Sequence, residues 1–465
     1  MSKESTKKIL FFCIGIVIGI CIALIPPPEG LTTESMRFMG IFLGAIFMLV
    51  TKPIADWSVI LGALALFPLT KTATVNEAFS AFSGGTMWLI IMVFAFSAGM
   101  GKSGLINRIA MNVLSIFPAT YRGAVTALTM CGVVVGPLIP SVTAKVNMII
   151  PIATASAEKM GLKERSKSAL GLWSAVYTTV NCGGNVFLSG SLHVSVMMGF
   201  MTKESFTYGS WFLATIVWFL VILVGNYLYC IFYCKPDEDL NLPPTFFKEK
   251  AKELGPASTH EKIATILLIT CLIVWTTTKM HGLDTAMFGL LAIVVMVASG
   301  LITTEDFVTK IPWGLMVFIG GLLGMSTLMN TLGWSNYIAA VLGPVVGPVV
   351  SSPWIFVPFL CIFSWVLRFV VIDNVTSLVI MNAVFSPFME AAHMSSFVLI
   401  FVHFMAALSW NMEYQNVYTR GTLAVAGNKY VTYKEAQKTS FVFCLLHLIA
   451  TFVSIPIWQA LGLIW

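Results

Sequence analysis

Charged residues are scarce in this chain. Asp, Glu, Lys and Arg make up 10% of the 465 residues, whereas hydrophobic residues make up 57%. A soluble domain cannot bury that much apolar surface in one core, so the composition indicates a polytopic membrane protein with the lipid bilayer as its surroundings. The net charge of +6 is small for this length. It gives no indication of a nucleic-acid partner.

The sequence also lacks the spacing of metal sites and the motifs of common hydrolases. Its nine cysteines lie mostly within apolar runs, so we interpret them as small buried hydrophobic residues. There is no His-Glu-x-x-His, Gly-x-Ser-x-Gly or paired-aspartate arrangement. Ser141 has no neighbouring base that the sequence can establish. We therefore expect no enzyme activity, no metal and no other cofactor.

Long apolar segments recur along the first half of the chain. Lysines precede the first segment, and cytoplasmic loops carry an excess of Lys and Arg, so a cytoplasmic N-terminus is expected. The stretch 26–29, Pro-Pro-Pro-Glu, offers no small-residue cleavage site, which favours a membrane helix over a signal peptide. The expected crossings of the first half lie at about 9–25, 37–51, 57–70, 86–101, 168–190 and 211–234.

Residues 121–150 form an apolar run that we expect not to cross the membrane. Glycine and proline interrupt the run, and basic residues follow it between Lys159 and Lys167. A single crossing would place those charges outside. A re-entrant hairpin that enters and leaves on the cytoplasmic side avoids this conflict, so we predict one here.

A hydrophilic stretch at 235–262 separates the two halves, 1–234 and 263–465. It carries five lysines and six acidic residues, which indicates a cytoplasmic linker rather than a domain. Crossings of the second half are expected at about 263–278, 284–300 and 312–330, then a hairpin at about 353–392, one further crossing and a last helix at about 440–463. This arrangement places the C-terminus outside.

Motifs of the first half recur in the second. The pattern Gly-x-x-Asn-x-Ile-Ala occurs at 104–110 and again at 333–339. The two glycines are 333 − 104 = 229 residues apart, and Thr143 and Thr376 are 376 − 143 = 233 apart. Similar offsets across unlike loops indicate duplication. The second hairpin enters from the opposite face, so we predict an all-α fold of two inverted repeats, with about 11 transmembrane helices plus two re-entrant hairpins, as in many secondary transporters.

Two polar clusters occupy matching places in the repeats. The first begins at Pro140 and the second at Asp373. Unpaired polar groups are costly in a membrane unless they face protein, water or a ligand, and helix N-termini favour anions. We predict that the two tips meet and hold both ends of a dicarboxylate; the alternative is that the clusters only cap broken helices. The side-chain donors at the tips are Ser141, Thr143, Asn374 and Thr376.

These clusters, and the glycine-rich segments that follow them, resemble the divalent anion:sodium symporter family of di- and tricarboxylate transporters. The resemblance covers nearly the whole chain. That family carries a Ser-Asn-Thr motif at each tip and a Gly-Thr-Pro-Pro-Asn-like segment one helix later in each half. The resemblance implies that these elements build the carboxylate and sodium sites of an elevator-type homodimer with scaffold and transport domains.

The chain departs from that pattern at several positions. Val142 and Val375 stand where the family has its middle asparagine, Gly190-Ser191-Leu192-His193 keeps neither proline, and 412–416 keeps only the final asparagine. By resemblance, the predicted substrate-binding residues are Ser141, Val142, Thr143, Ser191, Asn374, Val375, Thr376 and Glu413. Charge balance is assigned to Lys145, His193 and Asp373, and a possible cation site to Gly190, Asp373 and Asn374.

A charge at bilayer depth costs about 2.5–3.5 kcal/mol on insertion scales, so each of these charges needs a partner or a task. Lys145 can supply the positive charge that sodium supplies in relatives; alternatively it snorkels to the cytoplasmic surface. His193 is either a proton carrier or a hydrogen-bonded core residue, and Glu413 either contacts substrate or forms a structural pair with a basic residue of a hairpin. We expect Arg368 to be structural or to line the pathway.

The leading hypothesis is a secondary carrier of C4 and C5 dicarboxylates (succinate, malate, fumarate or 2-oxoglutarate) in the plasma (inner) membrane. We favour sodium-independent exchange, because valine replaces asparagine at both tips and Lys145 provides a fixed cation. Sodium-coupled symport of dicarboxylate or citrate is the alternative. An anion channel is the third possibility, because re-entrant hairpins also build pores.

Overall fold

The computed structural model describes residues 3–138, 141–201, 206–238, 240–243 and 245–464. Its elements are helical. Within these ranges no strand forms, and an isolated antiparallel bridge joins Thr120 to Asn241. The expected all-α fold is confirmed.

The first half contains four long apolar helices with shorter elements between them. Its elements are α1 (Lys3–Ala23), α2 (Thr33–Thr51), α3 (Asp56–Leu69), α4 (Val75–Ala78), α5 (Ser80–Ser83), α6 (Gly85–Ser103), α7 (Leu105–Leu114), α8 (Tyr121–Val135), α9 (Val142–Lys159), α10 (Lys167–Gly183), η1 (Gly184–Val186), α11 (Leu192–Phe200), α12 (Tyr208–Leu228) and η2 (Tyr229–Tyr233).

The linker holds one short helix, and the second half follows it. These elements are α13 (Phe246–Lys252), α14 (Thr259–Thr276), α15 (Thr278–His281), α16 (Thr285–Ala298), α17 (Thr304–Lys310), α18 (Trp313–Thr331), α19 (Trp334–Val350), α20 (Pro353–Val370), α21 (Asn374–Ala391), α22 (Ser396–Ala406), α23 (Val417–Val425) and α24 (Tyr433–Ala460).

Eight helices in the described ranges are long and apolar enough to cross a membrane. They are α1, α2, α6, α12 with its extension η2, α14, α18, α20 and α24. Shorter apolar helices, among them α3, α16 and α22, supplement these spans. The helix α20, expected as an arm of the second hairpin, belongs to the long group. The multi-pass membrane fold is therefore confirmed.

Local sequence explains where several helices begin. The side chains of Thr32, Ser258 and Thr303 accept hydrogen bonds from backbone N–H groups three residues on, and so begin α2, α14 and α17. We predicted that the first hairpin ends at residue 150, but its second helix, α9, continues through Pro151 to Lys159. A proline costs a helix one backbone hydrogen bond, and neighbouring helices can compensate for it in a membrane protein.

The two halves share one order of elements from α6 and α18 onward. Gly104 and Gly333 lie directly before α7 and α19, the helices that follow α6 and α18, and both have left-handed backbones (φ of 83° and 81°), a conformation that glycine adopts without a side-chain clash. A helix, a helix pair and a broken helix follow each glycine. The long helix α12 closes the first half, and α24 closes the second.

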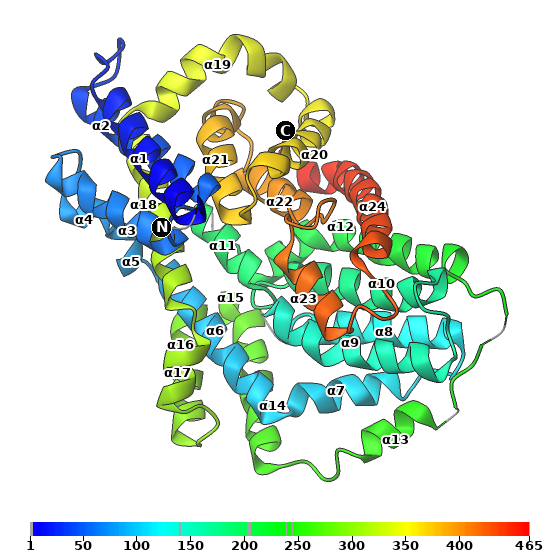
Figure 1. The fold of residues 1–465 in the computed structure, drawn as a ribbon. Helices are drawn as coiled ribbons and strands as arrows, with labels where there is room; N and C mark the ends of the chain where they lie inside the picture. Colours follow the sequence, from blue (N-terminus) through cyan, green and yellow to red (C-terminus); the bar gives the residue numbers. More distant parts are fainter. Residues whose placement is uncertain (1–2, 139–140, 202–205, 239, 244, 465) are drawn as a thin grey trace.

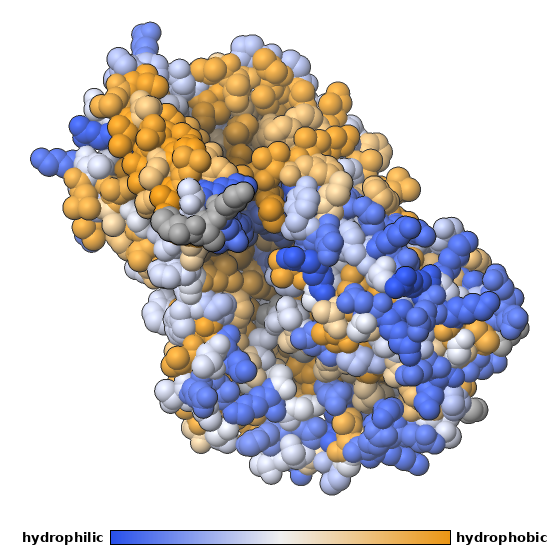
Figure 2. All heavy atoms as spheres, in the orientation of Figure 1, coloured by the Kyte–Doolittle hydropathy of each residue, from blue (hydrophilic) through white to orange (hydrophobic). Residues whose placement is uncertain are grey.

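The helices pack in two groups (Figure 1). The first group places α1, α2 and α3 beside α18, whereas α8, α9 and α10 pack on one another on the other side of the molecule. The helix α12 lies against α24, and both contact α10, so the closing helices of the two halves are neighbours. Figure 2 shows hydrophobic residues over the upper part of one face and hydrophilic residues at its lower right, where α13 lies in Figure 1.

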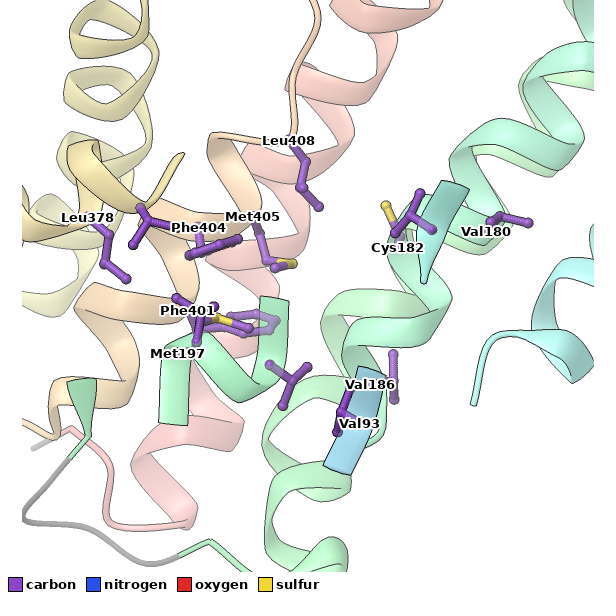
Figure 3. Packing of buried hydrophobic residues seen from close by; sticks show 14 of the residues in the cluster. Val93, Val180, Cys182, Val186, Met197, Leu378, Phe401, Phe404, Met405 and Leu408 are labelled. Carbon is purple, nitrogen blue, oxygen red and sulfur yellow. The ribbon is translucent and has the colours of Figure 1, made fainter. Parts of the chain in front are cut away.

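A buried apolar core supports the broken helices. Figure 3 shows Met197 of α11 and Leu378 of α21 together with Phe401 and Phe404 of α22, and all four side chains are buried. In a membrane, close packing of such side chains stabilises helix contacts through van der Waals attraction rather than through transfer from water. The short helix α11, which follows the first break, is therefore held by packing rather than by its own length.

Polar contacts link distant loops. Lys102 pairs with Asp306 (2.6 Å) and Lys429 with Glu158 (3.6 Å), while the Arg165 backbone N–H donates to the Tyr430 carbonyl (2.9 Å). The C-terminal turn of α6 therefore meets α17. Likewise, the loop after α9 meets the loop before α24.

Candidate functional site

A cavity of about 190 Å³ lies where the second tip, the second helix break and α11 meet. Four of the predicted residues line it: His193, Asp373, Asn374 and Val375. The other lining residues are Lys52, Leu192, Val196, Leu315, Ile319, Ile372, Phe404, Gln415, Asn416, Val417 and Tyr418. This volume is below the range of about 300–1,000 Å³ typical of drug-sized ligands, so it suits a small molecule.

The second tip places a helix N-terminus at this cavity. Asp373 caps α21, and its Oδ1 accepts hydrogen bonds from the Thr376 backbone N–H (2.7 Å) and hydroxyl (2.9 Å). Thr376 is buried and does not line the cavity. The first residues of α21, Asn374 and Val375, do line it. Unpaired N–H groups and the dipole at a helix N-terminus favour an anion there.

The second helix break adds another N-terminus. Asn416 caps α23: its Oδ1 accepts from the Thr419 backbone N–H (3.2 Å), and its Nδ2 donates to the Leu408 carbonyl (2.9 Å). The first residues of α23, Val417 and Tyr418, line the cavity. The N-termini of α21 and α23 therefore meet at one small space.

Two basic side chains complete the lining. His193 packs against the rings of Phe404 (5.2 Å between centroids) and Tyr418 (5.7 Å), and its buried Nδ1 has no hydrogen-bond partner among the residues that the structure describes. Lys52 follows α2 with a left-handed backbone (φ 50°), and its Nζ lies 3.3 Å from the Asp56 carboxylate. Our sequence reasoning missed Lys52, because lysines at the ends of membrane helices are common.

The cavity can bind a small dianion. Lys52 provides a positive charge, which its ion pair with Asp56 partly compensates, and the two helix N-termini provide N–H donors. Asp373 has the same sign as a carboxylate ligand, but its Oδ1 already accepts two hydrogen bonds, and it interacts electrostatically with the buried Arg368 guanidinium. The charge of Asp373 is therefore partly compensated within the protein.

The first tip does not reach this cavity. Ser141 caps α9, accepting from the Ala144 backbone N–H (3.2 Å), and lines a separate cavity of about 580 Å³. Val142 is buried, and Thr143 is exposed without lining either space. Pro140, the first residue of the predicted cluster, lies outside the described residues. The expected meeting of the two tips at one site is therefore not what this conformation contains.

The cavity at the first tip is basic. Lys102, Asp306 and Lys310 line it. Hydrogen bonds from the Lys102 ammonium and from the backbone N–H and hydroxyl of Thr303 hold the pKa of Asp306 below its usual range. Asp306 therefore stays ionised at neutral pH and balances Lys102, which leaves Lys310 as the excess positive charge among the residues that line this space.

Lys145 lies behind the first tip rather than at the surface. Its side chain is 0% exposed, and Nζ donates to the carbonyls of Gly136 and Gly190, each at 3.0 Å. A Cβ on Gly184 would come within 2.6 Å of this ammonium. The first helix break thus needs glycine to accommodate the lysine, and the snorkelling alternative does not describe this conformation.

The remaining predicted residues lie away from the cavity of the second tip. Ser191 is buried and caps α11, accepting from the His193 backbone N–H (3.2 Å). Glu413 is exposed in the loop before α23 and lines neither cavity. The three possible cation ligands are also separated: Asp373 and Asn374 line the cavity, but the Gly190 carbonyl accepts from Lys145 in the other half.

A comparison with protein families matches residues 6–465 to the sodium:sulfate symporter transmembrane region. The chain belongs to this family. Its membership confirms the resemblance to the divalent anion:sodium symporters, and the match extends over both halves, including both tips and both helix breaks.

Named relatives of the family include proteins from plants and bacteria. The chloroplastic dicarboxylate transporter 1 of Spinacia oleracea is 27% identical over 72% of this chain, which spans 60% of that protein's length. The putative malate transporter YflS of Bacillus subtilis is 25% identical, covering 79% of this chain and 76% of its own. An L-tartrate/succinate antiporter of Escherichia coli is 24% identical, covering 79% and 80%.

Two solved structures share the fold. The YdaH transporter of Alcanivorax borkumensis superposes with a TM-score of 0.60 at 12% identity, covering 99% of both chains. MtrF of Neisseria gonorrhoeae superposes with a TM-score of 0.60 at 12% identity, covering 98% of this chain and 95% of its own. At this identity the likeness concerns the fold of the family alone.

Proposed function

We propose that this protein is a secondary transporter of C4 and C5 dicarboxylates such as succinate, malate, fumarate and 2-oxoglutarate. The observation that carries the proposal is the small cavity where the N-termini of α21 and α23 meet Lys52. Two helix N-termini and a lysine match two carboxylates, because each carboxylate needs donors and positive potential. Relatives named as dicarboxylate or malate transporters support this substrate class.

The transport mode that we propose is sodium-independent exchange. The buried Lys145 side chain donates hydrogen bonds to two backbone carbonyls, a type of oxygen that also ligates sodium, and so places a basic group at the first helix break, where it interacts electrostatically with His193 of the cavity. The empty site carries this charge without a counterion, so its movement across the membrane is costly. A bound dicarboxylate lowers that barrier, and exchange follows. A relative named as an L-tartrate/succinate antiporter supports this mode.

Sodium-coupled symport is the second candidate. The carboxylate of Asp373 lies on the cavity beside Asn374, and carboxylate and amide oxygens are ligands that a hard cation accepts. This candidate predicts that uptake depends on a sodium gradient and proceeds without internal dicarboxylate.

The wider architecture that we propose is a homodimer in the inner membrane working as an elevator. Each protomer contains inverted repeats at 1–234 and 263–465, joined by a cytoplasmic linker at 235–262. The contacts of Lys429 with Glu158 and of the Arg165 backbone with Tyr430 support placing the basic segments 159–167 and 429–438 on one side of the membrane, which the positive-inside rule assigns to the cytoplasm. The N-terminus is then cytoplasmic and the C-terminus extracellular.

Radiolabelled succinate or malate uptake into proteoliposomes tests the function and its mode. With choline replacing sodium, vesicles preloaded with dicarboxylate should take up label at least about tenfold faster than empty vesicles. Lys145→Ala should abolish this exchange or convert it to leak, and Lys145→Arg should retain part of it. Lys159→Ala, at an exposed position on the same helix, is the matched control. Strong sodium dependence together with uptake into empty vesicles would favour symport instead.

A further inference from the structure

Arg368 is a second buried cation next to a tip. Its side chain in α20 is 1% exposed, Nη1 donates to the Val371 carbonyl at 3.2 Å, and Nη2 donates to the Gln415 carbonyl. The Gln415 side chain returns a bond, from Nε2 to the Arg368 carbonyl at 3.3 Å. Of the described carboxylates, none forms an ion pair with this guanidinium.

The partners of Arg368 occupy the same structural positions as those of Lys145. Gly136 is the C-terminal cap of α8, and Val371 is the C-terminal cap of α20. Gly190 directly precedes Ser191, the N-terminal cap of α11. In the same way, Gln415 directly precedes Asn416, the N-terminal cap of α23.

The two cations come from different helices of their pairs. Lys145 lies in α9, after the first tip, whereas Arg368 lies in α20, before the second tip. A shared sequence position therefore does not explain the correspondence. A buried arginine could satisfy its donors on carbonyls elsewhere, whereas Arg368 bonds to the same two kinds of position as Lys145. What recurs is a cation that joins the end of the first hairpin helix to the start of the second half-helix.

We propose that Lys145 and Arg368 are paired cationic tethers, one in each half, and that Arg368 is a positioning residue that holds the second tip against the second helix break. The tether determines the distance between Asn374 and Asn416, whose helix N-termini line the cavity. The test of this proposal by transport kinetics rests on the proposed function, whereas the test by hydrogen–deuterium exchange does not.

The arrangement also has an electrostatic consequence. Carbonyls at the C-terminal end of α20 and before α23 carry partial negative charge, and the guanidinium neutralises both. Asp373 lies at the same tip and interacts with this guanidinium. Arg368 thus makes the second half, like the first, independent of an added cation for holding its tip in place.

Hydrogen–deuterium exchange of the full-length protein in detergent measures the tether directly. Arg368→Gln should speed amide exchange at least tenfold in peptides covering 371–376 and 412–418, while peptides covering 142–148 and 187–192 stay unchanged. Arg368→Lys, which keeps the charge but loses the planar fork, should give an intermediate effect. Arg420→Gln, at an exposed position on α23, is the matched control.

The reciprocal variant and the kinetics complete the test. Lys145→Met should speed exchange at 142–148 and 187–192 but not at 371–376. In proteoliposomes Arg368→Gln should raise the KM for succinate at least tenfold, with partial rescue in Arg368→Lys. Unchanged exchange at 371–376, a uniform increase over the whole chain, or an unchanged KM would overturn the proposal. Absence of dicarboxylate transport by the unaltered protein would overturn only the proposed function.

Discussion

At the residue scale, Lys52 matters because the fold places it at the cavity of the second tip. It lines the cavity from α2, an element far in sequence from the second tip, and its partner Asp56 is partly exposed. A lysine in this position attracts a dianion but remains screened by solvent, so its contribution to binding is modest and depends on salt.

Lys52→Asn should weaken dicarboxylate binding about three- to tenfold, or about 0.6–1.4 kcal/mol. Asparagine tolerates the left-handed backbone at this position, so the change tests charge rather than folding. The matched control is Lys71→Asn, because Lys71 follows α3 with the same backbone conformation (φ 56°) and is exposed away from the cavity. Binding measured by thermal shift at two salt concentrations checks this. Equal affinities in both variants would exclude Lys52 from the site.

At the scale of elements, Arg108 and Glu261 form a clamp that holds the end of the linker against α7. Arg108 of α7 donates to both carboxylate oxygens of Glu261 at 3.0 Å and to the carbonyls of Leu254, Gly255 and Pro256. Glu261 also accepts from the Ser258 backbone N–H (2.6 Å), which caps α14. One arginine therefore connects the two halves through the start of the second.

Arg108→Ala should lower the apparent Tm in detergent by about 2–5 °C, because it leaves the buried Glu261 carboxylate without its arginine partner. Arg108→Lys should recover only part of the loss, because lysine cannot reproduce the forked geometry. Arg122→Ala, at an exposed position on the neighbouring α8, provides the comparison. If it lowered Tm as much as Arg108→Ala does, the clamp would have no special role.

Sequence patterns locate these elements better than they orient them. Apolar length and glycine placement predict the helices, the second hairpin and both breaks, because hydrophobic burial and backbone freedom are local properties. The direction in which each tip points cannot be predicted from local properties. It depends on Lys145 and Arg368 bonding to backbone carbonyls 45 and 47 residues further along the chain, and a carbonyl has no sequence signature.

The cavity could be predicted only in part for the same reason. Asp373, Asn374 and His193 were predicted because polar residues inside apolar runs are conspicuous. Ser141 and Thr143 are equally conspicuous, yet in this structure they lie elsewhere. Only the tertiary packing of α2 shows that Lys52 lines the cavity.

At the scale of the whole molecule, membrane orientation is the property that labelling can decide. We expect Lys163→Cys and Lys429→Cys to react with an impermeant maleimide only from the cytoplasmic side, because the basic loops concentrate there. The exposed native cysteines, Cys13 and Cys21, are replaced by serine first. Glu29→Cys, in the loop after α1, should react only from outside. Reaction of Lys163→Cys from outside alone would contradict the orientation, and reaction of the 163 and 429 probes from opposite sides would contradict the packing of their loops.

The buried cations also constrain how the chain is assembled during synthesis. The farther partner of Lys145 is 45 residues downstream and that of Arg368 is 47 residues downstream. At about 5–20 residues per second, a ribosome needs about 2–9 seconds to supply them. During that interval each helix pair holds a basic side chain whose burial in hydrocarbon is costly. We therefore expect each helix pair to settle in the bilayer only when the broken helix that follows it has been synthesised.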